Sequence, residues 1–154
     1  MKKLKLDHGM QTYGLAGGVL RFNPQDPNLY ARFLEMAERL PQFEQELLEK
    51  AQNLQQDGQG LMALLQQTDA RMKELLSQVF RGNDFDALLE GVNLLAVASN
   101  GERVITNLLQ ALEPILCAGA EEFAQAQADR AVEKARQRRA FAVLVQFSVR
   151  WASR

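Results

Sequence analysis

The sequence has few of the residues from which catalytic and metal sites are made. Its 154 residues include one histidine, one cysteine and one tryptophan. Metal sites built from nitrogen and sulfur ligands need several such side chains, so the sequence excludes them. A lone cysteine also excludes an internal disulfide and fits a reducing compartment. We therefore expect no metal, no cofactor and a cytoplasmic location.

Long apolar runs are absent as well. The most apolar stretch, residues 140–145, is far too short to span a bilayer. Residues 1–9 carry the charge of a signal peptide, but no apolar run follows them. The sequence predicts no membrane association.

Nothing in the sequence supports an enzyme. His8 would need a nucleophile and an orienting acid to act in catalysis, and a solvated turn explains it better. Cys117 stands among small apolar residues that predict a buried, unreactive thiol. The three glycines Gly14, Gly17 and Gly18 lack the spacing and the following helix of a phosphate-binding loop. The neighbouring carboxylates fall on amphipathic helices or at a helix cap: Glu44, Glu46, Glu49, Asp84, Asp86, Glu121 and Glu122.

Charge is unevenly distributed, although the net charge is only −1. Residues 35–129 carry 16 acidic and 6 basic side chains, whereas residues 130–154 carry 7 basic and 1 acidic. Residues 1–22 add 4 basic side chains against 1 acidic. An acidic middle with basic ends favours contacts between copies of the chain. We expect a homo-oligomer in which Arg136, Arg138 and Arg139 meet carboxylates of another copy.

Residues 29–79 carry the strongest pattern, because their apolar residues recur at alternating spacings of four and three. Such a period of about 3.5 residues is typical of a helix that packs lengthwise on another helix. Residues 55–60 form a polar, glycine-containing break between two such arms. The apolar positions are Leu29, Phe33, Met36, Leu40, Phe43, Leu47, Ala51 and Leu54 on the first arm, and Leu61, Leu65, Thr68, Met72, Leu75 and Val79 on the second.

The whole pattern predicts a mainly α, α+β fold in a single domain over 1–154. A small β-hairpin or three-stranded sheet (1–22) should pack on a helical hairpin (27–80), with strands near residues 4–6, 11–13 and 19–22. Asp26 and Pro27 are a helix start, and at Pro41 we expect either a kink in the first arm or the start of a fresh helix. Short helices (84–98) and a long helix (102–139) follow, and the tail (140–154) alternates like a strand but also fits a continued helix.

Several short motifs, taken in their order, resemble the tail assembly chaperones of siphovirus-like phages and prophages of Gram-positive bacteria. The resemblance covers about residues 3–116 and stops there. The motifs are Leu4-Lys5-Leu6-Asp7-His8-Gly9 to Tyr13; Arg21-Phe22-Asn23-Pro24-Gln25-Asp26 before a helix; Asp69, Met72 and Val79-Phe80-Arg81-Gly82; and Asp84-Phe85-Asp86 through Leu94-Leu95-Ala96, Asn100-Gly101-Glu102 and Asn107-Leu108-Leu109.

The resemblance implies an interaction protein of the bacterial host cytoplasm. Chaperones of this type bind the long helical tape measure protein, keep it soluble, help to recruit tail tube subunits, and are absent from the mature virion. An apolar stripe on a helical hairpin is a plausible groove for such a helix. The partner-binding residues we expect are Phe33, Met36, Leu40, Phe43 and Met72.

Two other classes of function stay open. One is a structural phage protein or coiled-coil adaptor, which would use the same stripe. The other is a nucleic-acid-binding regulator that acts through the Arg-rich helix at residues 130–139, because basic clusters attract phosphates. No recognition fold accompanies the cluster and the pI is about 5.9, so an acidic protein surface is the better partner for it.

Overall fold

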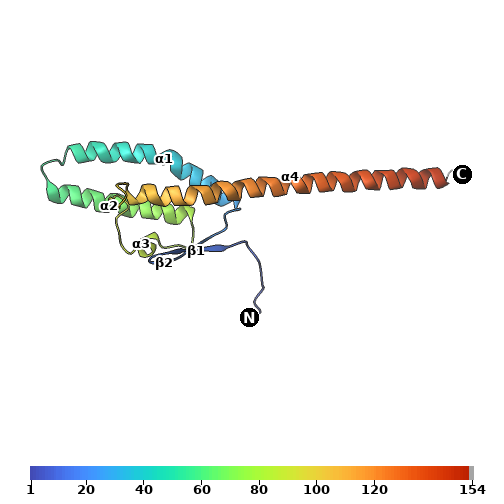
Figure 1. Cartoon of the computed structure of the whole chain (residues 1–154), viewed down its shortest axis with the longest axis horizontal. Helices are drawn as coiled ribbons and strands as arrows, with labels where there is room; N and C mark the ends of the chain where they lie inside the picture. The colour runs from blue at the N-terminus through green and yellow to red at the C-terminus, as the bar shows by residue number, and fades with distance from the viewer. Residues whose placement is uncertain (153–154) are drawn as a thin grey trace. The chain divides into compact units, whose positions relative to one another are not determined.

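The computed structural model describes the backbone of residues 1–152 and the side chains of residues 1–139. The chain divides into two compact units, Met1–Ala120 and Glu121–Arg154. The first holds two strands and three helices, and helix α4 continues from it into the second. The mainly helical α+β class predicted from sequence is confirmed (Figure 1).

The sheet is a two-stranded antiparallel hairpin rather than a three-stranded sheet. Strand β1 (Gln11–Leu15) pairs with β2 (Gly18–Phe22), and Leu15 faces Gly18 across a two-residue turn. The turn is therefore Ala16-Gly17. The third strand expected at residues 4–6 is wrong, because Leu4 and Leu6 are 95% and 80% exposed and pair with nothing in the described chain.

The hairpin is fixed to the helices on one edge and one face. The side-chain amide of Asn83 accepts from the Arg21 N–H at 2.9 Å and donates to the Arg21 carbonyl at 2.8 Å, as a neighbouring strand would. The Gly17 N–H donates to the Leu88 carbonyl at 3.1 Å. Leu20 and Phe22 are buried from the inner face, which supplies the support that an isolated hairpin needs.

Helices α1 (Pro27–Gln52) and α2 (Gly58–Val79) form the predicted hairpin. The Asp26 carboxylate caps α1 by accepting from Asn28 N–H at 2.9 Å, and Asp57 caps α2 in the same way through Gly60 N–H. Helix α1 continues through Pro41 and bends along its course (Figure 1). Proline at this position removes the hydrogen bond to residue 37, which explains why a bend occurs without a break.

Only part of the predicted helical stretch 84–98 is helical. Helix α3 (Phe85–Leu88) begins at its Asp84 cap, but residues 92–98 form turns and an isolated bridge between Val97 and Arg103. The Leu94 N–H donates to the Asp69 carboxylate at 2.8 Å. That tertiary bond holds the backbone in a non-helical path and overrides the local helical pattern. Helix α4 (Val104–Ala152) begins two residues later than predicted.

The core gathers around Phe80, which is fully buried. Its ring lies 5.1 Å from Phe22, 5.8 Å from Phe85 and 6.5 Å from Phe33, measured between ring centroids. One aromatic cluster thus joins the sheet, the hairpin and α3. The first turns of α4 complete the core with four buried residues: Ile105, Leu108, Leu112 and Leu116.

A buried lysine joins three segments on the side of α2. The ammonium of Lys73, 6% exposed, lies 2.9 Å from the Asp69 carboxylate and 2.6 Å from that of Asp86. Burial lowers the pKa of Lys73, but the hydrogen bonds to Asp86 and Asp69 raise it by more, so the pKa lies above its ordinary value. Because Asp69 also binds Leu94, the network joins α2, α3 and the loop after α3.

The second unit consists of the continuation of α4 from Glu121, whose backbone is helical to Ala152. The side chains of residues 140–152 and the end of the tail, residues 153–154, lie outside the described residues. Within the described part of the chain, no helix has the length and apolar content needed to cross a membrane. The prediction of a single domain over 1–154 stays a prediction.

Candidate groove between α1 and α2

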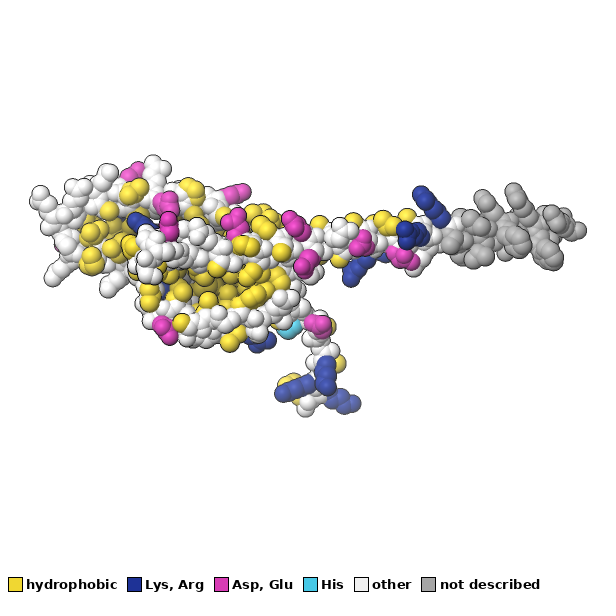
Figure 2. All heavy atoms as spheres, in the orientation of Figure 1, with side chains coloured by type: hydrophobic (Ala, Val, Ile, Leu, Met, Phe, Trp, Pro, Cys, Tyr) yellow, Lys and Arg dark blue, Asp and Glu magenta, His cyan; other side chains and the backbone are white. Residues whose placement is uncertain are grey.

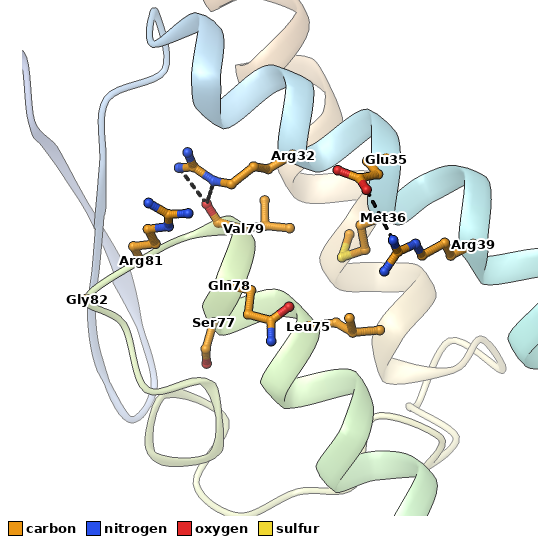
Figure 3. A pocket seen from close by; sticks show the side chains of 10 residues that line it. All are labelled: Arg32, Glu35, Met36, Arg39, Leu75, Ser77, Gln78, Val79, Arg81 and Gly82. Atoms are coloured by element: carbon orange, nitrogen blue, oxygen red, sulfur yellow. Dashed lines mark hydrogen bonds and ion pairs between the residues drawn. The ribbon is translucent and has the colours of Figure 1, made fainter.

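Two hollows follow one another along the line where α1 and α2 pack. The larger, of about 630 Å³, lies near the open end of the hairpin (Figure 3). Its lining comes from α1, the end of α2 and the turn after α2: Arg32, Glu35, Met36, Arg39, Leu75, Ser77, Gln78, Val79, Arg81 and Gly82.

The second hollow, of about 40 Å³, lies nearer the turn that joins the two helices. Four of its residues come from α1 and four from α2. They are Phe43, Glu46, Leu47, Lys50, Leu64, Gln67, Thr68 and Arg71.

Both hollows use the same face of each helix. Successive α1 residues that line them are mostly three or four positions apart, a spacing that places side chains along one side of a helix. The row runs from Arg32 to Lys50, which corresponds to about 27 Å of helix at 1.5 Å per residue. We call the two hollows together the α1–α2 groove, defined by their lining residues. It matches a partner helix of about 18 residues.

The floor of the groove is apolar and its edges are basic. Met36, Phe43, Leu47, Leu64 and Leu75 supply the apolar part. Between residues 23 and 102 the chain has only six basic residues. Lys73 is buried, and all five others line the groove: Arg32, Arg39, Lys50, Arg71 and Arg81. Glu35 and Glu46 are its only carboxylates, so the groove is basic within a strongly acidic part of the chain.

The arginines differ in how firmly they are held. Arg32 donates to the Val79 carbonyl through Nε at 3.1 Å and through a terminal nitrogen at 3.0 Å, as the dashed lines of Figure 3 show. Arg39 pairs with Glu35 at 3.1 Å, an exposed pair of little energetic weight. The guanidinium of Arg71 lies over the Phe43 ring, 4.5 Å from its centroid. Within the described chain, the Arg81 side chain has no hydrogen-bond or ion-pair partner and is exposed.

A separate, more enclosed cleft of about 60 Å³ lies between α1, α2 and the first turns of α4. It contains three of the residues predicted to bind a partner, namely Leu40, Phe43 and Met72. Phe43, Leu47 and Thr68 line both this cleft and the α1–α2 groove. The other lining residues are Glu44, Leu47, Thr68, Leu95, Ile105, Thr106 and Leu109.

The structure divides the five predicted partner-binding residues into two groups. Phe33, Met36 and Met72 are only 8%, 5% and 8% exposed, so most of each side chain belongs to the core. Leu40 and Phe43 are half-buried and reach the surface. The basic edge of the groove was not predicted from the sequence. Arg32 and Arg39 are seven residues apart, and this spacing alone indicates that they share one face of a helix.

Other residues singled out from the sequence are not among those that line the groove. Arg136, Arg138 and Arg139 are exposed on the second unit, and their role in self-association stays a prediction. Cys117 is exposed, so the expectation of a buried thiol is wrong. His8 is exposed, as expected of a turn residue. Among the described residues, no three His, Cys, Asp or Glu side chains are grouped so as to hold a metal ion.

Comparison of the chain with protein-family models, curated proteins and solved structures found no match.

Proposed function

We propose that this protein is a phage tail assembly chaperone that binds the tape measure protein, keeps it soluble and helps to recruit tail tube subunits. The sequence resemblance supports the class of function. The α1–α2 groove is the observation that carries the proposal, because it offers an apolar floor of the length that a partner helix needs. On this proposal the protein acts in the host cytoplasm and is absent from the mature virion.

The chemistry of the groove narrows the kind of helix it accepts. An amphipathic helix exposes an apolar stripe that aggregates in water, and the half-buried floor residues can cover such a stripe: Phe43, Leu47, Leu64 and Leu75. The five basic residues along the edges favour acidic side chains on either side of that stripe. We therefore expect the bound segment to be an apolar stripe flanked by Asp and Glu. Repulsion by the acidic remainder of residues 35–129 would direct that segment towards the groove.

Co-expression with a helical segment of the tape measure protein from the same genome tests the proposal. We expect the wild-type chain to keep the segment soluble and the Arg39→Glu/Arg71→Glu variant to lose most of this effect. Both side chains are exposed, so the fold should persist. Arg21→Glu/Arg103→Glu is the matched control, because it reverses two exposed charges outside the groove.

Equal solubilisation by all three chains would overturn the groove as the binding site. Failure of the wild-type chain to keep any tape measure segment soluble would overturn the chaperone function itself. The genome offers an independent check. A tail tube gene just before this gene and a very long tape measure gene just after it are expected.

Nucleic-acid binding is a second candidate, favoured by the basic residues of the second unit. Every described side chain from Arg130 to Arg139 is exposed, and Arg130, Lys134, Arg136, Arg138 and Arg139 are among them. Binding through phosphates would weaken steeply with salt. An Arg136→Glu/Arg138→Glu variant that lost DNA or RNA binding in a shift assay, yet solubilised the tape measure segment normally, would separate the two activities.

A further inference from the structure

The two edges of the β-hairpin differ in whether their backbone groups are hydrogen-bonded. This difference points to an interaction that lies outside the proposed chaperone activity. The β2 edge is closed, because the Asn83 side chain binds both backbone groups of Arg21. Arg21 faces Thr12 across the ladder. In a two-residue hairpin, residues at that register point their backbone groups away from the partner strand. The same holds for Gly14 opposite Val19.

The β1 edge is therefore open. The N–H and C=O groups of Thr12 and Gly14 face outward, and within the described chain no hydrogen bond outside the hairpin reaches them. An open edge of this kind is a template for another strand. Tyr13 and Leu15, on the inner face of β1, are only half-buried, so apolar surface beside this edge is also left accessible.

Residues 3–6 have the composition of the missing strand. Leu4 and Leu6 alternate with Lys3 and Lys5, and both leucines are among the most exposed apolar side chains of the chain. Figure 2 shows this segment standing clear of the sheet, with lysines in dark blue beside apolar side chains. As an added strand, the segment would place Leu4 and Leu6 on one face, beside Tyr13 and Leu15, and its lysines on the other.

Residues 3–6 are not paired with their own sheet edge, and the residues just after them are held on the other side of the hairpin. The His8 carbonyl accepts from the Asn23 side chain at 3.0 Å, and the Gly9 N–H donates to the Asp7 carboxylate at 2.9 Å. Asn23 directly follows Phe22, so the His8–Asn23 bond holds His8 beyond the last ladder pair, Gln11 with Phe22. Folding residues 3–6 back onto β1 would require a reversal between residues 7 and 10 and the loss of the His8–Asn23 bond.

We infer that residues 3–6 of one copy add as a third strand to the open β1 edge of a second copy of this chain. The occupant is a second copy because this chain itself supplies a strand with the required alternation, and that strand is unpaired within its own molecule. The contact is separate from the α1–α2 groove and does not require a tape measure partner.

Hydrogen exchange and sedimentation of the full chain test the inference. At concentrations where the chain sediments as a dimer or larger, the Thr12 and Gly14 amides should exchange at least ~10-fold more slowly than at dilutions where it is monomeric. Tyr13, whose amide belongs to the intramolecular ladder, is the internal reference. Leu4→Lys/Leu6→Lys should abolish this concentration-dependent protection. Leu48→Lys/Val97→Lys, at positions 62% and 70% exposed, is the matched control and should retain it.

Each other result would overturn the inference. Fast exchange at Thr12 and Gly14 in every oligomeric state would mean that the edge stays open and that any oligomer uses another surface. Protection at all concentrations would mean that the chain's own segment folds back. If the control variant lost the protection of the Thr12 and Gly14 amides to the same extent, the loss would be a general effect of removing exposed apolar groups.

Discussion

Replacing Lys73 by methionine tests how much the buried ion pairs contribute to the fold. Methionine keeps the length and the apolar stem but removes the charge. Asp86 is 67% exposed, so water can solvate its carboxylate once the ammonium is gone. Asp69 is only 14% exposed and would keep an uncompensated charge, relieved in part by its bond from Leu94 N–H.

Breaking a buried pair costs about 3–5 kcal/mol. Since only one of the two carboxylates is strongly desolvated, we expect about 3 kcal/mol for Lys73→Met. Lys73→Met/Asp69→Asn should lose only about 1 kcal/mol, because it removes the stranded charge while the new amide oxygen can still accept from Leu94 N–H. Urea unfolding followed by circular dichroism measures both values. Loss of less than about 1 kcal/mol in the single variant, or no recovery in the double variant, would refute the reasoning.

The wild type and the Lys73→Met variant can also be compared as a function of pH. The folded-state pKa of Lys73 is raised, so the contribution of the pair is complete below the ordinary lysine value of 10.5. It is lost as the pH rises from there through the folded-state pKa. The difference in stability between wild type and Lys73→Met should therefore be constant near neutral pH and shrink in alkali. Taking the difference cancels the other groups that titrate in that range.

Two further predictions concern a close contact and the stripe. An added Cβ at Gly119 would meet the Pro24 backbone, whereas at Gly58 nothing lies within 4 Å of it. We therefore expect Gly119→Ala to lower the free energy of unfolding by about 1–3 kcal/mol. Gly58→Ala should leave it unchanged or raise it by up to about 1 kcal/mol, and urea unfolding measures both values. An equal effect of the two would contradict the contact. Met36→Asp should unfold the chain, because the carboxylate would be buried without a partner. Phe43→Asp should remain folded by circular dichroism and lose solubilisation of the tape measure segment, and the reverse pattern would remove Phe43 from the groove.

Local signals in the sequence were sufficient for much of the fold. The Asp26-Pro27 start, the polar break between the arms and the Asp84 cap depend on neighbouring residues alone, and each appears in the structure. The apolar rhythm likewise located the hairpin. The apolar rhythm does not indicate which residues of the stripe fill the core, because that depends on which of them α4 covers.

Tertiary contacts decided the places where sequence reasoning was wrong. Residues 92–98 have a helical apolar pattern, but Asp69, more than twenty residues earlier, binds the Leu94 N–H and holds a different path. Residues 4–6 alternate as a strand does, yet a strand forms only where a neighbour is available. The basic edge of the groove was hidden because Arg32 and Arg81 are far apart in sequence and meet only when α1 and α2 pack antiparallel.

The distribution of buried residues along the hairpin bears on how the groove could work. On α1 the buried residues, Leu29, Phe33 and Met36, all belong to its first half. On α2 the buried residues begin at Thr68, at the middle of the helix, and run to its end at Val79. Both sets lie at the open end, next to the Phe80 cluster, whereas towards the connecting turn the helices contribute only half-buried or exposed side chains.

The hairpin is thus anchored at one end and lightly packed at the other. Binding elements are drawn from the less stable parts of a fold, because those parts can separate without loss of the core. At the open end, Arg32 is tied to Val79 by two hydrogen bonds and can fix the position of an incoming acidic group. Towards the turn, Phe43 and Leu47 are half-buried rather than buried, so part of each side chain is free to contact a partner. A helix inserted there would replace weak internal contacts with its own apolar stripe, which gives a physical reason for locating the binding energy on this half of the groove.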